Sequence, residues 1–141
     1  MKTALYLRVA SLLTFLHAAL HIIGGVFGKP APGLGAVAYA AMRANHFHVL
    51  GVSRTYWNFY FGMSVGIAIS LTAGGFLLWL LGSLAGAHAA ELRPILWVFV
   101  IYFLALAWNS AVYLFIGPVI GELLIAACLF AALATAKPAT A

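Results

Sequence analysis

Charged residues are scarce in this sequence, and acidic ones are almost absent. Of the 141 residues only 6% are charged, and two acidic residues stand against seven lysines and arginines. An average soluble domain is about 25% charged and about 45–50% apolar, whereas 66% of this chain is hydrophobic and its mean hydropathy is +1.12. So few charges cannot cover the surface of a water-soluble globule of this size. The composition therefore predicts an integral membrane protein.

Cysteine is nearly absent too, and the common catalytic motifs are missing. A single cysteine, Cys128, excludes an internal disulfide and a cysteine metal cage. The chain has no HExxH, nucleophile elbow, phosphate-binding loop or dinucleotide fingerprint. The net charge is +5, but the basic residues are scattered beside apolar runs, as contact with lipid headgroups requires. We therefore exclude nucleic acid as a partner, and also a disordered chain, a coiled coil and a disulfide scaffold.

Four apolar runs are long enough to cross a bilayer, for which a helix needs about 20 mostly apolar residues. They lie at about residues 5–27, 57–81, 94–115 and 118–135. Backbone in lipid must satisfy its own hydrogen bonds, and no run alternates with period two, so helices are expected rather than a barrel. We predict an all-α fold in which residues 1–141 form a single transmembrane domain, an antiparallel four-helix bundle with a long first loop.

That first loop, residues 28–56, opens with the breaker segment KPAPGLG and continues as AVAYAAMRANHFHVLG. The spacing of Val37, Ala41, Ala44 and His48 predicts a short helix on the membrane or over the bundle. An HxH pair can supply two metal ligands, but on a helix His46 and His48 point apart. We therefore predict no metal site. The alternative is a metal site with these two histidines as ligands.

The polar residues inside the spans gather in one half of the membrane. At 1.5 Å per residue, His21, Asn109 and Glu122 each lie about five residues from a run's midpoint, roughly 7–8 Å from the bilayer centre. All three are displaced toward the long loop, and Asn58 lies on the same side. A lone carboxylate in lipid must be neutral or paired. We therefore predict that Glu122 faces the bundle interior within hydrogen-bond distance of His21 or Asn109.

These polar groups define a candidate intramembrane site. His21 and Glu122 are the candidates for proton transfer. The predicted ligand-binding residues are His17, Asn58, Tyr102, Asn109 and Tyr113. The small-x-x-x-small pattern of Gly62 and Gly66 predicts a close approach of helices beside the site.

Four stretches together resemble a family of small, uncharacterised four-helix bacterial inner-membrane proteins. They are HAALHIIGG, SRTYWNFYFGMSVGI, LRPILWVFV and LFIGPVIGELL, and the resemblance covers residues 5–134. In that family the second helix usually begins Ser-x-Trp-Asp, whereas this chain has Trp57-Asn58, which argues against an acid–base role at position 58. The resemblance implies a fold and a location in the inner membrane, but no activity. In architecture alone the chain is also similar to emopamil-binding-protein-like and DoxX-like bundles.

The orientation rests on a small difference in positive charge. Lys2, Arg8, Arg93 and Lys137 share one side of the membrane, and Lys29, Arg43 and Arg54 share the other. The positive-inside rule then predicts that both termini are cytoplasmic.

Three functions remain open on the sequence alone. The first is a membrane protein that holds a small lipophilic ligand (an isoprenoid, quinone or sterol-like molecule), with a lipid-modifying, isomerase-like activity if it is an enzyme. The second is a non-catalytic accessory or assembly subunit that binds a membrane protein partner or a second copy of itself. The third is a haem protein with two axial histidines, one from the first span and one from the loop, His46 or His48.

Overall fold

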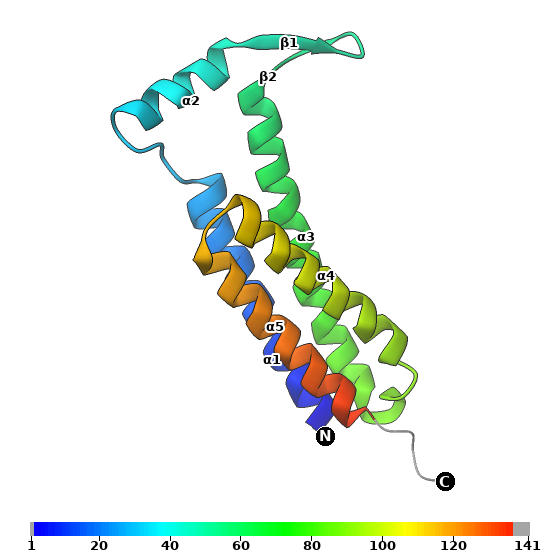
Figure 1. Ribbon diagram of the computed structural model, residues 1–141. Coiled ribbons are helices and arrows are strands. Elements are labelled where there is room, and N and C mark those ends of the chain that lie inside the picture. The colour runs from blue at the N-terminus through cyan, green and yellow to red at the C-terminus, as the bar shows by residue number, and fades with distance from the viewer. Residues whose placement is uncertain (1, 137–141) are drawn as a thin grey trace. The chain divides into compact units, whose positions relative to one another are not determined.

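The computed structural model describes residues 2–136 and is built mainly from helices (Figure 1). In chain order the elements are α1 (Lys2–His21), a π-helical turn η1 (Ile22–Val26), α2 (Leu34–Ala44), β1 (His46–Val49), β2 (Val52–Thr55), α3 (Tyr56–His88), α4 (Arg93–Tyr113) and α5 (Ile116–Thr135). The predicted all-α class is confirmed, with one short hairpin added.

Four of the helical segments are long and apolar enough to cross a membrane, which confirms the four predicted runs. They are Lys2–Val26, Tyr56–His88, Arg93–Tyr113 and Ile116–Thr135. The main difference lies in α3, which runs on to His88 instead of ending near residue 81. With 33 residues, α3 is about 50 Å long at 1.5 Å per residue, well beyond the ~30 Å of a bilayer's hydrocarbon core.

The described part of the chain folds as two compact units, and the first combines residues 2–18 with residues 71–136. In this unit α4 begins with Pro94 in its first turn, where the missing N–H costs nothing, and α4 packs along α5 after the short link at residues 114–115. Side chains from α1, α3, α4 and α5 share one apolar core. Its largest fully buried members are Leu7, Leu71, Leu78, Leu96, Phe103, Ile125 and Leu129.

A close approach of α1 and α3 occurs at Gly75. The Ser11 hydroxyl donates to the Gly75 carbonyl at 2.7 Å, and a Cβ on Gly75 would lie only 2.8 Å from the Phe15 ring. At Gly62 and Gly66, by contrast, a Cβ would meet nothing within 4 Å among the described residues. Within residues 19–70 no close approach is seen at Gly62 or Gly66, and the predicted approach of another helix there stays a prediction. Their spacing identifies a face of the helix but not whether a neighbour packs against it.

The second unit comprises residues 19–70, and it corrects the prediction for the long loop. A helix forms over 34–44 as expected, but Asn45 turns to extended backbone and its side-chain amide donates to the Ala41 carbonyl at 2.7 Å. The chain then forms an antiparallel hairpin instead of continuing as a helix to His48. Its two turn residues, Leu50 and Gly51, have φ of 48° and 78°, the positive values that a tight type I′ hairpin turn requires.

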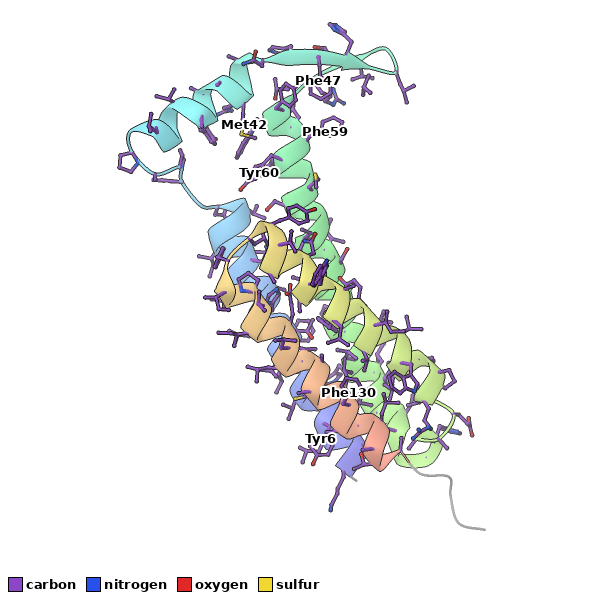
Figure 2. The ribbon with its side chains drawn as sticks, in the orientation of Figure 1. Tyr6, Met42, Phe47, Phe59, Tyr60 and Phe130 are labelled. Atoms are coloured by element: carbon purple, nitrogen blue, oxygen red, sulfur yellow. The ribbon has the colours of Figure 1, made fainter. Side chains whose placement is uncertain are left out.

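Aromatic contacts hold α2 and the hairpin against the start of α3. The rings of Tyr39 and Trp57 are 4.5 Å apart between centroids. Phe47 packs on Tyr56 at 5.0 Å and on Phe59 at 5.2 Å. Figure 2 shows Phe47 pointing from the hairpin toward Phe59 of α3. These contacts fix which face of the hairpin is turned toward the helix.

Candidate functional site

Glu122 is a buried carboxylate in the first unit. It lies in the second turn of α5 and leaves only 3% of its surface exposed. Its Oε1 accepts a hydrogen bond of 3.0 Å from the hydroxyl of Ser110, which is itself buried on α4. An ionisable group in the apolar interior of helices is expensive to keep, and such groups mark functional sites by default.

His17 of α1 is the second neighbour of this carboxylate. Its Nε2 lies 3.6 Å from Glu122 Oε1, and 13% of its side-chain surface is exposed. The other ring nitrogen lies against Gly121, where a Cβ would come within 2.8 Å of Nδ1. Because Gly121 has no side chain, the imidazole can approach α5 closely beside the acid.

The second carboxylate oxygen has no such neighbours. Glu122 Oε2 is buried and makes no hydrogen bond to any residue within 2–136. Buried polar atoms almost always have a partner, so an exception calls for an explanation. We call the three side chains His17, Ser110 and Glu122 the Glu122 site. It can accept a hydrogen bond at Oε2, and the imidazole can take or give a proton.

The partners of Glu122 differ from those that the sequence predicted. Ser110 and His17 fill the places predicted for Asn109 and His21. Asn109 is exposed on α4. His21 has its own partner in the second unit, because its Nε2 hydrogen-bonds the Ser64 carbonyl at 2.9 Å. The rise per residue gives the depth of a side chain but not its direction around the helix, which turns by about 100° at each residue.

Ser110 is the one residue of the Glu122 site that the sequence analysis missed. A signal for it exists, since it continues a row of buried positions on α4 at spacings of three and four. The row is Leu96, Val100, Phe103, Ala107 and Ser110. A small hydroxyl residue on an otherwise apolar, inward row is a candidate partner for a buried acid.

Among the predicted site residues of the first unit, the structure places His17 beside Glu122, and Tyr102 of α4 is close enough to interact with the charge of Glu122. Tyr102 is half-buried and packs edge-on against Phe103, while Tyr113 is exposed at the end of α4. The proton-transfer role of His21 and the ligand contacts of Tyr102 and Tyr113 stay predictions.

Asn58 has a local role in the second unit. Its Oδ1 accepts hydrogen bonds from the Thr55 backbone N–H at 2.8 Å and from the Thr55 hydroxyl at 3.0 Å. In return, the Asn58 N–H donates to the Thr55 hydroxyl at 3.1 Å. This reciprocal arrangement is a capping box at the start of α3. It explains the amide at position 58 without a ligand.

We expect Asn58→Ala to lower the free energy of unfolding by about 0.5–1.5 kcal/mol, because the Thr55 N–H loses its acceptor while the Thr55 hydroxyl still caps the N–H of residue 58. Asn58→Asp should retain the cap, because a carboxylate oxygen accepts the same bonds and suits the positive end of the helix dipole. Thermal unfolding of both variants in detergent, followed by circular dichroism, checks this. Equal melting temperatures for the alanine and aspartate variants would contradict the capping role.

The HxH pair lies on strand β1, where residues two apart point to the same face. The expectation that His46 and His48 point apart is therefore wrong, because it assumed a helix. His46 Nδ1 lies 3.5 Å from the Ser53 hydroxyl on the neighbouring strand. In the part of the chain that the structure describes, no group of three or more histidine, cysteine, aspartate or glutamate side chains is placed to hold a metal ion.

Comparison of the chain with protein-family models, with curated proteins and with solved structures finds no match. The chemistry of the Glu122 site is therefore argued from its own residues.

Proposed function

We propose that this chain is a multi-pass protein of the bacterial inner membrane, with its four long helices arranged as an antiparallel bundle and both termini in the cytoplasm. The helices are supported as spans by their length and composition. Large apolar side chains are also exposed on the surfaces of these helices, among them Ile69, Val98 and Ile101. Such side chains would be costly in water and are expected against lipid.

Within this bundle, we propose that the Glu122 site holds the polar head of a small lipophilic ligand. The observation that carries the proposal is the buried, unpartnered Oε2 of Glu122. A ligand that donates a hydrogen bond to this atom would remove the cost of leaving it unpaired. His17 is partly exposed, so we propose that a molecule dissolved in the bilayer reaches the site on the side of His17.

The chemistry of the site narrows the class of ligand. When Glu122 is ionised and paired with a protonated His17, its carboxylate only accepts hydrogen bonds, so the proposed ligand carries a donor. Among isoprenoid, quinone and sterol-like molecules, this favours those with a hydroxyl group: an isoprenoid alcohol, a sterol or a quinol. With His17 beside the acid, the pair can also take and return a proton, which is the basis for an isomerase-like activity.

The test compares the lipids that copurify with the wild type and with Glu122→Gln. Glutamine keeps an oxygen that accepts from Ser110 but places an NH₂ group where Oε2 lies. The variant protein should therefore fold normally but no longer bind a ligand that donates a hydrogen bond. Mass spectrometry of lipid extracts should show a hydroxyl-bearing lipid enriched with the wild type and absent from the variant. Glu91→Gln, at the exposed acid after α3, is the matched control. The same lipids in all three samples would overturn the proposal.

A second candidate, an assembly subunit, is favoured by the end of α4. Asn109 is exposed there beside Trp108 and Tyr113, which are also largely exposed. An amide on the outer face of a membrane helix is a frequent contact between helices. If this face binds a membrane protein or a second copy of the chain, Asn109→Leu should release the partner that copurifies with the wild type. The lipids bound at the Glu122 site would stay unchanged.

A further inference from the structure

Residues 34–55 lie next to the start of α3 and expose several large apolar side chains. The proposed ligand site does not account for this exposed apolar surface. The helix α2 has 11 residues and is about 16 Å long, too short to cross a bilayer. It is nevertheless apolar almost all round, and Leu34 and Val37 are 87% and 65% exposed. A short, exposed apolar helix of this kind is typical of a segment that lies in the membrane interface.

The hairpin that follows α2 has one apolar and one polar face. In the observed register, Phe47 pairs with Arg54 and Val49 with Val52, so these four share a face. The opposite face carries His46, His48, Ser53 and Thr55. Because Phe47 packs on Tyr56 and Phe59, the apolar face is the one turned toward the body of α3 (Figure 2).

The residue at the tip of the hairpin, Leu50, is an unfavourable choice for a turn that is exposed to water. Leu50 is fully exposed and has a φ of 48°, a left-handed conformation that asparagine and glycine adopt far more readily than leucine. Val49 and Val52 flank it and are each 43% exposed. A disfavoured backbone conformation that retains an apolar side chain indicates that this side chain has a use.

The surface beneath the apolar face fits a phospholipid. A shallow depression there is lined by Arg54, Asn58, Phe59, Gly62 and Met63. The guanidinium of Arg54 can bind a lipid phosphate, and the apolar side chains of Phe59 and Met63 can contact an acyl chain. The bare Gly62 helps to keep this depression open, since nothing stands near its Cβ position. Tyr56, Trp57 and Tyr60 ring the same turn of α3, and such aromatic belts mark the level of the headgroups.

We propose that the hairpin inserts its apolar face and the Leu50 tip into the headgroup and acyl boundary of the leaflet at this end of α3, with Arg54 on a lipid phosphate. The charge of Arg54 and the level of the aromatic belt favour lipid, rather than water, over the part of this face that α3 leaves exposed, which is Val49, Val52 and the Leu50 tip. The polar face with His46, His48 and Ser53 is then turned to water. This inference rests on the membrane placement proposed above.

The test places an environment-sensitive fluorophore on either side of the hairpin. In a Cys128→Ala background, single cysteines at Leu50, Ser53 and Ile101 are labelled with a nitrobenzoxadiazole probe. The protein is then reconstituted into vesicles of phosphatidylcholine and phosphatidylglycerol. Leu50→Cys should be quenched by lipids with a nitroxide near the headgroup and protected from aqueous iodide. Ser53→Cys, on the opposite face, should show a several-fold larger iodide quenching constant.

Each outcome decides a separate point. Equal iodide quenching at Leu50 and Ser53 would overturn the inference. Protection at Leu50 without quenching by nitroxide lipids would also overturn it, because protein rather than lipid would then cover the tip. Ile101→Cys is exposed on α4 and reports on the membrane placement itself. If lipid quenches the probe at Ile101 but not at Leu50, the hairpin inference fails while the membrane placement stands. Failure at Ile101 would count against the membrane placement.

Discussion

Replacing Glu122 by leucine is expected to lower the free energy of unfolding by about 1–3 kcal/mol, the cost of leaving a buried hydrogen-bonding group without a partner. Leucine would place an apolar side chain against the buried Ser110 hydroxyl and the His17 imidazole. Glu122→Gln keeps an acceptor for Ser110 and should unfold close to the wild type. Thermal and denaturant unfolding in a mild detergent measures the three proteins side by side.

A double variant separates the hydrogen bond from the change in shape. Removing both partners of a buried hydrogen bond is often nearly neutral, so Ser110→Ala should restore part of the stability lost in Glu122→Leu. The same Ser110→Ala change in the wild type should destabilise instead. A Glu122→Leu protein as stable as the wild type would mean that the carboxylate makes no net contribution to the fold.

Gly75→Leu is expected to destabilise the protein by about 1–3 kcal/mol, because it forces extra atoms into a filled space. A Cβ at this position already lies 2.8 Å from the Phe15 ring, and the Ser11 hydroxyl holds α1 against the Gly75 carbonyl. The helices would have to separate, and the hydrogen bond from Ser11 would lengthen or break. The melting temperature in detergent reports the loss.

Gly62→Leu is the matched control on the same helix. A Cβ there meets nothing within 4 Å among the described residues, so the larger side chain has room. Both substitutions replace a helical glycine by leucine and gain the same helix propensity. Their difference in stability therefore measures the close approach at Gly75 alone. A Gly62→Leu protein that melts as low as Gly75→Leu would show that the face of Gly62 is packed.

The sequence was sufficient to predict the features that follow from the chemistry of lipid and backbone, namely the long helices and a buried acid. The four apolar runs identified the four long helices, and the lone acid in the last run identified Glu122 as a buried polar centre. The partner of Glu122 was harder to predict, because depth along a helix is known from the rise but rotation depends on packing. Ser110 rather than Asn109 therefore faces the acid, and His17 one turn before His21 lies beside it.

The hairpin could not be predicted for a different reason. Two-residue hairpin turns are usually signalled by asparagine or aspartate followed by glycine, and here the turn is Leu50-Gly51. The preceding residues also have helical spacing, which is satisfied only as far as Ala44. The helical spacing was overridden by the packing of Phe47 on α3.

If α3 crosses a bilayer as proposed, its length bears on the thickness of the membrane that suits this protein. A helix of 33 residues would have to tilt by more than about 50° to fit within ~30 Å of hydrocarbon, beyond the 0–40° found for membrane helices. In the membrane placement proposed above, part of α3 would therefore project from the bilayer. Trp57 and Trp79, with Arg8 stacked 5.4 Å over the latter, are separated by a rise of about 33 Å, close to the thickness of the hydrocarbon. In a thinner bilayer these two anchors could not both lie at an interface without tilt, so hydrophobic mismatch would favour thicker regions of membrane.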